Sequence, residues 1–320
     1  MTTVAFVFPG QGSQSVGMGQ RLAAVSPAAA AVFAESDRAM DGTISQLAWA
    51  GPAEVLDRTE NAQPALLTTS IAFLAALRER WAVDGTAPQP AFLAGHSMGQ
   101  YSAMVAAGTI ELGEAVRLVR ERGRLMQASA TGREGRMAAI IGLNDDRLPE
   151  LIDRAGAHGV FGLANRNSPG QVVVSGERPA VEAAVELAKE LGAKRAILLP
   201  VSVAAHSPLM ADAAVGLRTA LDGVAFADPA APLLANRDAR ILTTGEQARD
   251  ELVEHLTAGV DWVRAVETMA VAGVDRFIEV GPGRVLTGLI KRIVPDVEAL
   301  PADAPEAPDG LVVFDRRIPA

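Results

Sequence analysis

The chain of 320 residues contains no cysteine and only four histidines, and aromatic residues make up 4% of it. The absence of cysteine excludes disulfides, thiolate metal sites and a cysteine nucleophile. It is also compatible with a cytoplasmic protein, and we expect that location. Because histidines are so few, each can be weighed individually as a candidate base.

Long apolar runs and an excess of basic residues are missing as well. No run approaches the roughly 20 residues that a membrane helix needs, so we expect no membrane span. The apolar segment Val4 to Phe8 has no basic region before it and a glycine turn directly after it, which indicates a strand rather than a signal peptide. The net charge of −9 argues against general nucleic-acid binding, and any anionic substrate must be met by a local basic site.

The chain does contain a large apolar fraction, 49%, arranged in strand-like and helix-like segments. Its length suits one large domain or a main domain with a smaller insert. Helical patterns are predicted at Arg21 to Met40 and at Ala65 to Trp81, and the second is apolar nearly all round, as in a helix packed inside a domain. Asp275 to Val280 is the last clear strand, and Leu286 to Ile293 is the last core helix. These features favour an α/β protein.

The stretch Gly95-His96-Ser97-Met98-Gly99 lies between the apolar run Ala91 to Ala94 and the helix-like stretch Gln100 to Ala107. A G-x-S-x-G string at a strand-to-helix turn is the pattern of a nucleophile elbow. Glycines relieve the crowding of such a sharp turn, and the helix N-terminus favours a developing oxyanion. The alternative is a chance match in a chain with 30 glycines.

The loop Pro9 to Gln14 follows the first strand, and such loops line the active crevice of open α/β sheets. Its glycines would let a backbone N–H approach an oxyanion, although a plain tight turn is an equally good interpretation. A dinucleotide fingerprint is excluded because Ser15 stands where glycine is required, and no phosphate-loop Gly-Lys pair follows.

Arg122 lies on the apolar stripe of a predicted helix. Leu112, Ala115, Val119 and Met126 are spaced as one helix face, and Arg122 falls on that same face. A guanidinium that points inward is costly unless it meets an anion. A buried structural ion pair would satisfy it, and so would the carboxylate of a substrate, which the planar fork of arginine can bind in a bidentate way.

Residues 135–199 show a separate pattern of predicted strands and helices. The predicted order is βαββαβ, which is the ferredoxin-like order, with Asn165 to Gly170 as the turn between the middle strands. The six elements are Met137 to Ile141, Leu148 to Ala155, Val160 to Ala164, Gln171 to Ser175, Pro179 to Leu191 and Arg195 to Leu199. We interpret them as a small lobe inserted in the larger domain, forming one wall of a cleft.

His206 follows this insert and is the best candidate for a catalytic base. Ser207 and Pro208 form a good helix start, so His206 lies in the junction just before a helix. His96 adjoins the elbow serine and should point away from it, and the two other histidines lack a comparable context. A lone histidine at a helix start is more often structural, but its position between lobes favours catalysis.

With these residues in place, the chain resembles the malonyl-CoA:acyl-carrier-protein transacylases, the acyltransferase family shared by fatty-acid and polyketide synthesis. The resemblance runs from Val4 to Arg292, and chance agreement at seven separated places is very improbable. The motifs are Phe8-Pro9-Gly10-Gln11-Gly12-Ser13-Gln14, Gln63-Pro64-Ala65, the elbow GHSMGQYSA from Gly95 to Ala103, Arg122-Gly123 with Met126, Asn167-Ser168-Pro169-Gly170-Gln171, His206-Ser207, and Gly281-Pro282-Gly283 before Leu286-Thr287-Gly288-Leu289.

The resemblance implies a mechanism. Ser97 would attack the thioester of malonyl-CoA while His206 takes its proton, and the backbone N–H groups of Gln11 and Met98 would hold the oxyanion. Arg122 would bind the free carboxylate of the malonyl group. Coenzyme A would then leave, and the phosphopantetheine thiol of an acyl carrier protein would take the acyl group in a ping-pong transfer. No metal or redox cofactor is implied, since the coenzyme A thioester is a substrate.

Three further positions follow from the resemblance. The backbone carbonyl that orients the histidine is assigned to His255, where the family commonly has Gln or Asn, and Gln63 is a candidate for lining the site. Ala205 precedes the histidine at a position that tracks acyl size in polyketide relatives. Its small side chain leaves branched malonyl groups open, although malonyl is favoured because stand-alone malonyl enzymes also carry small residues there. Gln100 stands where many relatives have Glu.

Other functions remain open. A serine acyl hydrolase would use the same serine and base, but Arg122 favours an acid substrate and no Asp or Glu has the context of a triad member. A non-catalytic module is disfavoured by the joint presence of Ser97, Arg122 and His206. A discrete trans-acting acyltransferase of polyketide synthesis is not distinguished from one of fatty-acid synthesis.

The predicted fold is an α/β-hydrolase-like large domain with a parallel sheet, built from residues 1–130 and 205–320, with a ferredoxin-like small subdomain at residues 131–204. Residues 300–320 are predicted to be a linker or tail, and Val312 to Phe314 is too short to assign. We expect a monomer. An acidic carrier protein would dock on Arg117, Arg120 and Arg124, unless these simply form a solvated helix face.

Overall fold

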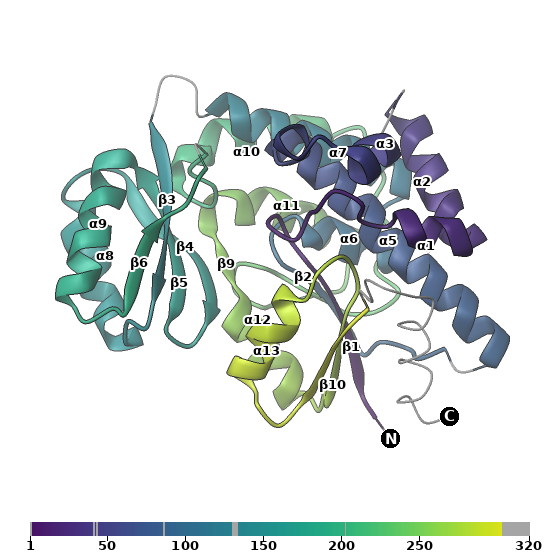
Figure 1. Cartoon of the computed structure of the whole chain (residues 1–320). Helices are drawn as coiled ribbons and strands as arrows, with labels where there is room; N and C mark the ends of the chain where they lie inside the picture. The colour runs from purple at the N-terminus through teal and green to yellow at the C-terminus, as the bar shows by residue number, and fades with distance from the viewer. Residues whose placement is uncertain are drawn as a thin grey trace.

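The computed structural model describes residues 2–40, 42, 44–85, 87–129, 134–201 and 203–302. Two sheets organise the chain, one of six strands and one of five (Figure 1). The strands of the larger sheet follow the order β11-β10-β1-β2-β7-β8, and all pair in parallel except β8. They are β1 Val4–Phe8, β2 Phe92–Gly95, β7 Leu233–Leu234, β8 Ile241–Leu242, β10 Arg276–Glu279 and β11 Glu298–Pro301.

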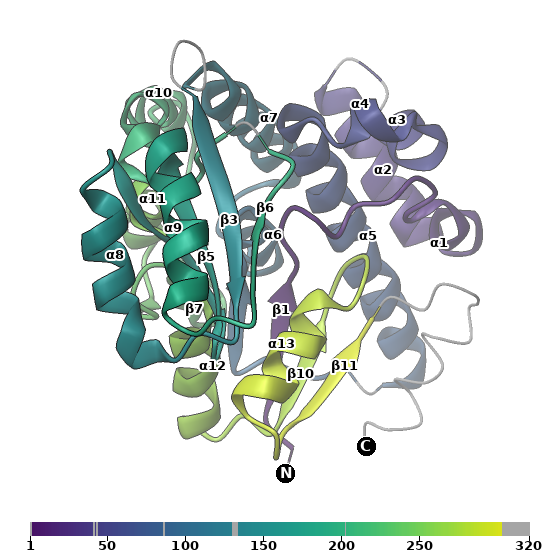
Figure 2. The same ribbon diagram turned by 60° about the vertical axis from the view of Figure 1, so that its left-hand side comes forward.

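Helices cover both faces of this sheet, as the fully buried strand β1 predicts. Phe6 and Phe8 of β1 pack into the core formed with α2, α5, α6 and α7, whereas Ala5 and Val7 face α12 and α13. Figure 2 shows β1, β10 and β11 side by side beneath α13. The helices are α1 Gln20–Val25, α2 Pro27–Ala39, α3 Ile44–Ala50, α4 Ala53–Leu56, α5 Thr59–Asp84, α6 Gly99–Ala106, α7 Leu112–Ser129, α10 Ala211–Leu221, α11 Gly245–Ala258, α12 Trp262–Val271 and α13 Val285–Ile293.

The predicted helix Arg21 to Met40 is in fact two helices. Ser26 ends α1 and caps α2, where its hydroxyl accepts a hydrogen bond from the N–H of Ala29, and Pro27 takes the first position of α2. Proline is favoured there because that N–H has no helical partner. The chain therefore restarts at a cap that the apolar pattern alone does not reveal.

The helix predicted at Ala65 to Trp81 begins earlier, at Thr59, with Pro64 inside it. An internal proline leaves the carbonyl four residues earlier without its N–H partner. Here that carbonyl belongs to Glu60, and the guanidinium of Arg120 donates to it at 3.1 Å. A side chain from α7 thus replaces the backbone bond that Pro64 cannot make.

The smaller sheet confirms the predicted βαββαβ order. It runs β6-β3-β5-β4-β9, and α8 and α9 pack on one of its faces (Figure 1). Its first four strands have the antiparallel pairing of a ferredoxin-like lobe. The elements are β3 Gly135–Ile141, α8 Leu148–Gly156, β4 Phe161–Ser168, β5 Gln171–Glu177, α9 Arg178–Glu190 and β6 Arg195–Leu198.

Two details of this lobe differ from the prediction. The segment Asn165 to Gly170 is not all turn, because β4 continues to Ser168 and only Pro169 and Gly170 separate it from β5. The fifth strand, β9 Val260–Asp261, comes from far along the chain and pairs in parallel with β4. The small sheet therefore includes a strand that comes from the part of the chain after residue 204, and the exact domain boundaries stay a prediction.

The prediction of a linker from residue 300 is wrong at its start. Leu300 and Pro301 belong to β11, which pairs with β10 and extends the large sheet. This strand contains no β-branched or aromatic residue and ends in proline, so its composition does not separate it from the Pro- and Ala-rich segment that follows. Residues 303–320, with Val312 to Phe314, lie outside the described part of the chain. Within that part, no helix has the length and apolar character to cross a membrane.

Candidate active site

Ser97 stands at the turn between β2 and α6, as the elbow pattern predicts. Its backbone adopts the left-handed conformation, with φ of 53°. The flanking glycines have no substitute there, because a Cβ on Gly95 would overlap the backbone of Gly99 and one on Gly99 would overlap the carbonyl of Phe8. A left-handed non-glycine residue costs about 1–3 kcal/mol and persists only where its surroundings hold it in place.

His206 lies against this serine. The Oγ–H of Ser97 donates to Nε2 of His206 at 2.8 Å, and the Nδ1–H of His206 donates to the backbone carbonyl of His255 at 2.7 Å. The carbonyl therefore fixes the tautomer in which Nε2 is free to accept a proton. Ser207 caps the following 3₁₀ turn Pro208–Met210, so the predicted helix start is correct, and His206 itself is left-handed with φ of 58°.

The carbonyl of His255 belongs to the last turn of α11, where the helix dipole is negative. A partial negative charge there favours an imidazolium on His206, as the carboxylate of a triad does. In the resting state that imidazolium is disfavoured. Burial, together with the positive charge of Arg122, lowers the pKa of His206 to about 3, so the imidazole is neutral and able to act as a base.

Arg122 points from α7 to the same place. Its side chain is only 1% exposed, Nη1–H donates to Oε1 of Gln63 at 2.8 Å, and Nη2–H donates to Oγ of Ser97 at 3.3 Å. Gln63 is itself anchored, because its Nε2 donates to Thr59. The Nε–H of Arg122 has no partner and no carboxylate pairs with this guanidinium within the described residues, so the interpretation as a structural ion pair has no support there.

The two residues whose backbone amides are predicted to hold an oxyanion are both linked to this cluster, Met98 as the neighbour of Ser97 in the chain and Gln11 through Thr59. Met98 follows the nucleophile and is the N-cap of α6, where backbone N–H groups have no helical acceptor. Gln11 lies in the turn after β1, and its side-chain carbonyl accepts a hydrogen bond from Thr59 at 2.9 Å. This contact ties the loop to α5, the helix that carries Gln63.

Comparison with known proteins agrees with this geometry. Residues 5–304 match the acyl transferase domain family. Malonyl CoA-acyl carrier protein transacylases of Escherichia coli strain K12 and Bacillus subtilis strain 168 are 46% and 43% identical over 96% of the chain and cover 98% and 95% of their own lengths. The chain belongs to this transacylase family.

Solved structures of the family share the fold. An acyl carrier protein S-malonyltransferase of Vibrio cholerae is 44% identical with a TM-score of 0.89, over 94% of this chain and 96% of that one. The enzyme of Bartonella henselae is 41% identical with a TM-score of 0.93, over 99% of both chains. A malonyl-transacylase solved in complex with its type II polyketide-synthase acyl carrier protein is 40% identical with a TM-score of 0.91, over 99% of this chain and 100% of that one.

Several residues around Ser97 were not predicted to belong to the site. Asn236 follows β7 and accepts the N–H of Ser97 at 2.8 Å, and Asn167 of β4 accepts from Nε2 of His96 at 2.9 Å. Glu251 of α11 is fully buried and accepts the N–H of Asn236 at 2.6 Å. Asn167 was part of a recognised motif without a role, whereas nothing in the sequence around Asn236 or Glu251 marks either as part of the site.

Ala205 lies between the two lobes, where it packs against the main core and against the small cluster formed by Met137, Ala164 and Val173. This placement is compatible with the predicted role at the acyl pocket. Gln100, at the position where relatives often carry Glu, is fully buried behind the elbow rather than in contact with Arg122.

The three arginines predicted to dock a carrier protein are already engaged. Arg117 forms an ion pair with Glu114, and Arg124 forms one with Glu121, each one turn earlier on α7. Arg120 donates to Glu60 and to Asn61. The two pairs are exposed and weak, but they reduce the positive charge that this face offers, so the solvated-face interpretation gains support.

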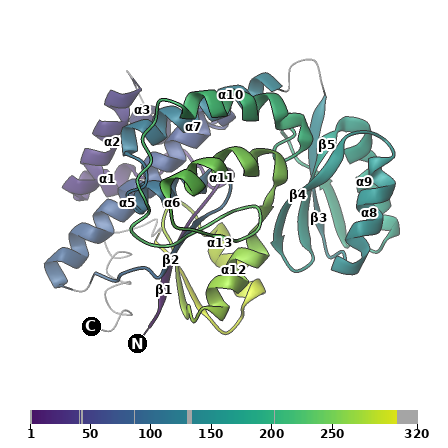
Figure 3. The ribbon, with the colours of Figure 1, turned by 180° about the vertical axis from the view of Figure 1, so that it is seen from behind.

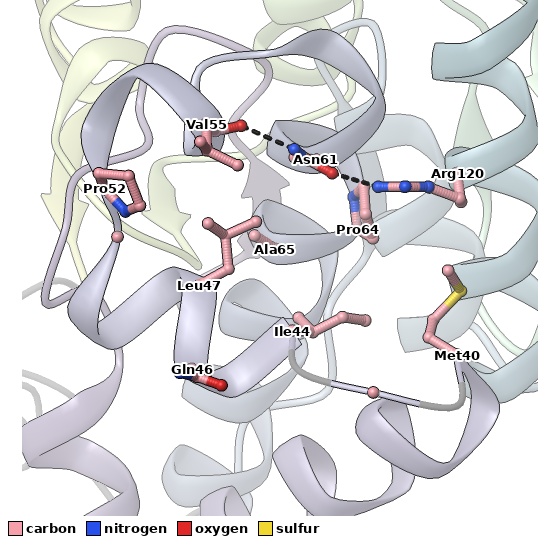
Figure 4. A pocket seen from close by; sticks show the side chains of 12 residues that line it. Met40, Ile44, Gln46, Leu47, Pro52, Val55, Asn61, Pro64, Ala65 and Arg120 are labelled. Carbon is pink, nitrogen blue, oxygen red and sulfur yellow. Dashed lines mark hydrogen bonds between the residues drawn. The ribbon is translucent and has the colours of Figure 1, made fainter.

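A cavity of about 520 Å³ lies between residues 40–55, the start of α5 and Arg120. Figure 4 shows Met40, Ile44, Leu47 and Val55 around it, with Asn61 and Arg120 at one edge. None of its lining residues contributes to the serine, histidine and arginine cluster. The same segment of α5 therefore presents Gln63 to the site and Asn61 to this cavity.

Proposed function

We propose that this chain transfers a malonyl group from coenzyme A to the phosphopantetheine thiol of an acyl carrier protein by a ping-pong reaction at Ser97. The observation that carries this is the meeting of Ser97 with two groups at once. His206 accepts its hydroxyl proton at 2.8 Å, and the buried guanidinium of Arg122, which has an unpartnered Nε–H, lies 3.3 Å from its oxygen.

In the first half-reaction, Oγ of Ser97 attacks the thioester carbonyl while its proton passes to Nε2 of His206. The negative charge on the carbonyl oxygen is stabilised by the backbone N–H groups of Gln11 and Met98. Collapse of this intermediate breaks the carbon–sulfur bond, and the imidazolium returns the proton to the departing sulfur of coenzyme A. A malonyl ester of Ser97 remains.

In the second half-reaction, the thiol of the carrier's phosphopantetheine arm gives its proton to His206 and attacks the ester carbonyl. The carbon–oxygen bond breaks and Ser97 regains its proton, so the products are the malonyl thioester of the carrier and the starting enzyme. The two half-reactions balance without any external acid, oxidant or cofactor.

Arg122 selects acids among acyl groups. Its buried charge has no carboxylate partner among the described residues, and a substrate carboxylate would provide one. The Oε1 of Gln63 holds Nη1, which leaves the remaining edge of the fork for the substrate. A simple ester hydrolase has no use for such a group, and this argues for malonyl transfer over acyl hydrolysis.

Intact-protein mass spectrometry after brief incubation with malonyl-CoA, methylmalonyl-CoA or acetyl-CoA tests the proposal. We expect a malonyl adduct on the wild type, none on Ser97→Ala, and loss of the adduct to added holo carrier protein. Loss of the adduct to water even in the presence of carrier would indicate a hydrolase. No adduct from any of the three donors would refute the transfer reaction.

A carrier of polyketide synthesis is the second candidate acceptor, because a relative 40% identical was solved with such a carrier bound. The same experiment distinguishes the two acceptors when a carrier of fatty-acid synthesis and a carrier of polyketide synthesis are compared. Preferential formation of a methylmalonyl adduct would point to a branched substrate, for which the small Ala205 leaves room.

A further inference from the structure

Four hydrogen bonds converge on Asn236, which is only 3% exposed. Its Oδ1 accepts the N–H of Ser97 at 2.8 Å, and its Nδ2 donates to Oε1 of Gln100 at 2.9 Å. Its own N–H donates to Oε1 of Glu251 at 2.6 Å, and its carbonyl accepts the N–H of Asp261 at 2.7 Å. One residue therefore contacts the elbow, α6, α11 and β9.

The orientation of both amides in this network is determined by backbone groups. The N–H of Ser97 can only donate, so the oxygen of Asn236 must face it and the nitrogen must face Gln100. The carbonyl of Leu234 can only accept, so Nε2 of Gln100 donates to it at 2.9 Å, and the oxygen of Gln100 faces Asn236 and the N–H of Gly95. If the side-chain amide of Asn236 or of Gln100 were flipped, two donors or two acceptors would face each other.

The network also reaches the histidine. Glu251 is on α11, four residues before His255, and the Nδ1–H of His255 donates to the backbone carbonyl of Glu251 at 2.9 Å. The carbonyl of His255 in turn orients His206. Figure 3 shows α11 packed beside α10 on this side of the molecule. Asn236 thus stands between the backbone of the nucleophile and the helix that positions the base.

We propose that Asn236 is a positioning residue, which holds the left-handed backbone of Ser97 and fixes it relative to α11, so that Oγ of Ser97 and Nε2 of His206 meet in reactive geometry. This inference rests on the proposed function for its biological meaning. Its physical reason is that a strained elbow needs an outside partner, and the N–H of Ser97 finds that partner in Oδ1 of Asn236. Misplacement by about 1 Å can reduce a rate by about 10²-fold.

The first test uses a fluorophosphonate probe, because its reaction needs no acyl-CoA. The serine oxygen displaces fluoride from phosphorus, and Ser97→Ala gives the blank. We expect Asn236→Ala to be labelled on the order of 10²-fold more slowly than the wild type. Asn236→Asp keeps an oxygen for the N–H of Ser97 but opposes the oxygen of Gln100, so we expect a loss of only about 10-fold.

Asn61→Ala is the matched control. That asparagine also uses its side chain twice, to the carbonyl of Val55 at 2.7 Å and to Arg120, but it faces the cavity of Figure 4 rather than the serine. We expect wild-type labelling from it even if its melting temperature falls. Equal labelling of Asn236→Ala and wild type, compared per folded molecule, would overturn the positioning role.

Single-turnover acylation by malonyl-CoA then distinguishes positioning from binding. The acylation rate constant of Asn236→Ala should fall on the order of 10²-fold while the half-saturating concentration stays within about twofold, because Arg122 and Gln63 are untouched. A rise in half-saturation with an unchanged rate constant would overturn the inference. If Asn236→Ala does not fold, Asn236→Asp decides, since a loss on the order of 10²-fold there would contradict the role of the retained oxygen. Normal probe labelling without a malonyl adduct would refute the proposed function alone.

Discussion

The pair Ser97 and His206 and the pair Arg122 and Gln63 lie next to each other, yet the fold holds them by different means. Both residues of the first pair have left-handed backbones and lie in turns, with φ of 53° and 58°. In the second pair, Gln63 lies within the long helix α5, directly before Pro64, and Arg122 lies within the long helix α7. The reacting pair is therefore held by tertiary contacts, and the pair proposed to bind the carboxylate is held by secondary structure.

The two pairs also interact electrostatically, through the charge of Arg122 and the imidazole of His206. Arg122 lies within reach of Ser97 and its charge is one cause of the low pKa of His206, the larger cause being burial. By itself, the charge of Arg122 therefore makes His206 a weaker base. A bound malonyl carboxylate would neutralise that charge and restore part of the basicity, so an acid substrate would improve the base that acts on it.

Removing the base should give the largest effect. His206→Ala leaves Ser97 without a proton acceptor, and general-base catalysis typically contributes about 10²–10⁴-fold. We expect kcat/KM for malonyl transfer to fall by about 10³-fold or more, measured by steady-state transfer to holo carrier protein. His158→Ala removes an exposed histidine of the small lobe and should leave the rate unchanged. A His206→Ala enzyme with a tenth or more of the wild-type activity would exclude this residue as the base.

Replacing Arg122, the proposed partner of the substrate carboxylate, should affect malonyl transfer and acetyl transfer differently. Arg122→Ala loses a buried charged partner of the substrate, and such losses cost about 2–5 kcal/mol, or about 30-fold to 5 × 10³-fold in kcat/KM for malonyl-CoA. Acetyl-CoA has no carboxylate, so its transfer should be kept or improved. Since Arg122 lowers the pKa of His206, the acid limb of the acetyl pH profile should also move to higher pH in the variant.

Arg218→Ala removes an exposed arginine of α10 to which no role is assigned, and it serves as the control. It should change neither the rates with the two donors nor the pH profile. An equal loss of activity with malonyl-CoA and acetyl-CoA would contradict the role of Arg122 as a carboxylate clamp. An unchanged acid limb would contradict its electrostatic influence on His206.

The same difference explains how far the sequence predicts the site. Arg122 was identified because helical periodicity places it on an apolar stripe, and the structure finds it buried there. Ser97 was identified because its glycines and its strand-turn-helix context are local. Asn236 was missed because it reaches the elbow from 139 residues away along the chain, and Glu251 was missed because it acts only through its hydrogen bond to Asn236. No local pattern reports such contacts.

The fold shows the same distinction between features that a local sequence pattern predicts and features that depend on contacts in space. The βαββαβ order of the small lobe was predicted because each element has its own period. In contrast, β9 has only two residues, and β11 has no β-branched or aromatic residue and ends in proline. The break at Ser26 and the start of α5 before Pro64 depend on a cap and on the side chain of Arg120. These are contacts between neighbours in space, which a linear pattern does not contain.

The smallest effect we predict concerns stability rather than rate, and it depends on the buried histidines that surround the reacting pair. Burial lowers the pKa of His96, His206 and His255, so each binds its proton less readily in the folded chain than in the unfolded chain. Their contribution is complete above the unfolded pKa of about 6.5 and is lost as the pH falls. Glu251 acts in the opposite direction, because burial raises its pKa to about 7, but one group opposes three.

We therefore expect the free energy of unfolding to fall between pH 6.5 and 5 by on the order of 2 kcal/mol per pH unit, measured by urea titration at each pH. His255→Gln keeps the backbone carbonyl for His206 and removes one buried imidazole, so its slope should be shallower by about 1.4 kcal/mol per pH unit. His158→Gln, at an exposed position, should keep the wild-type slope. Stability that stays level or rises on acidification would mean that most of these three histidines take up protons inside the folded chain, contrary to the lowered pKa values.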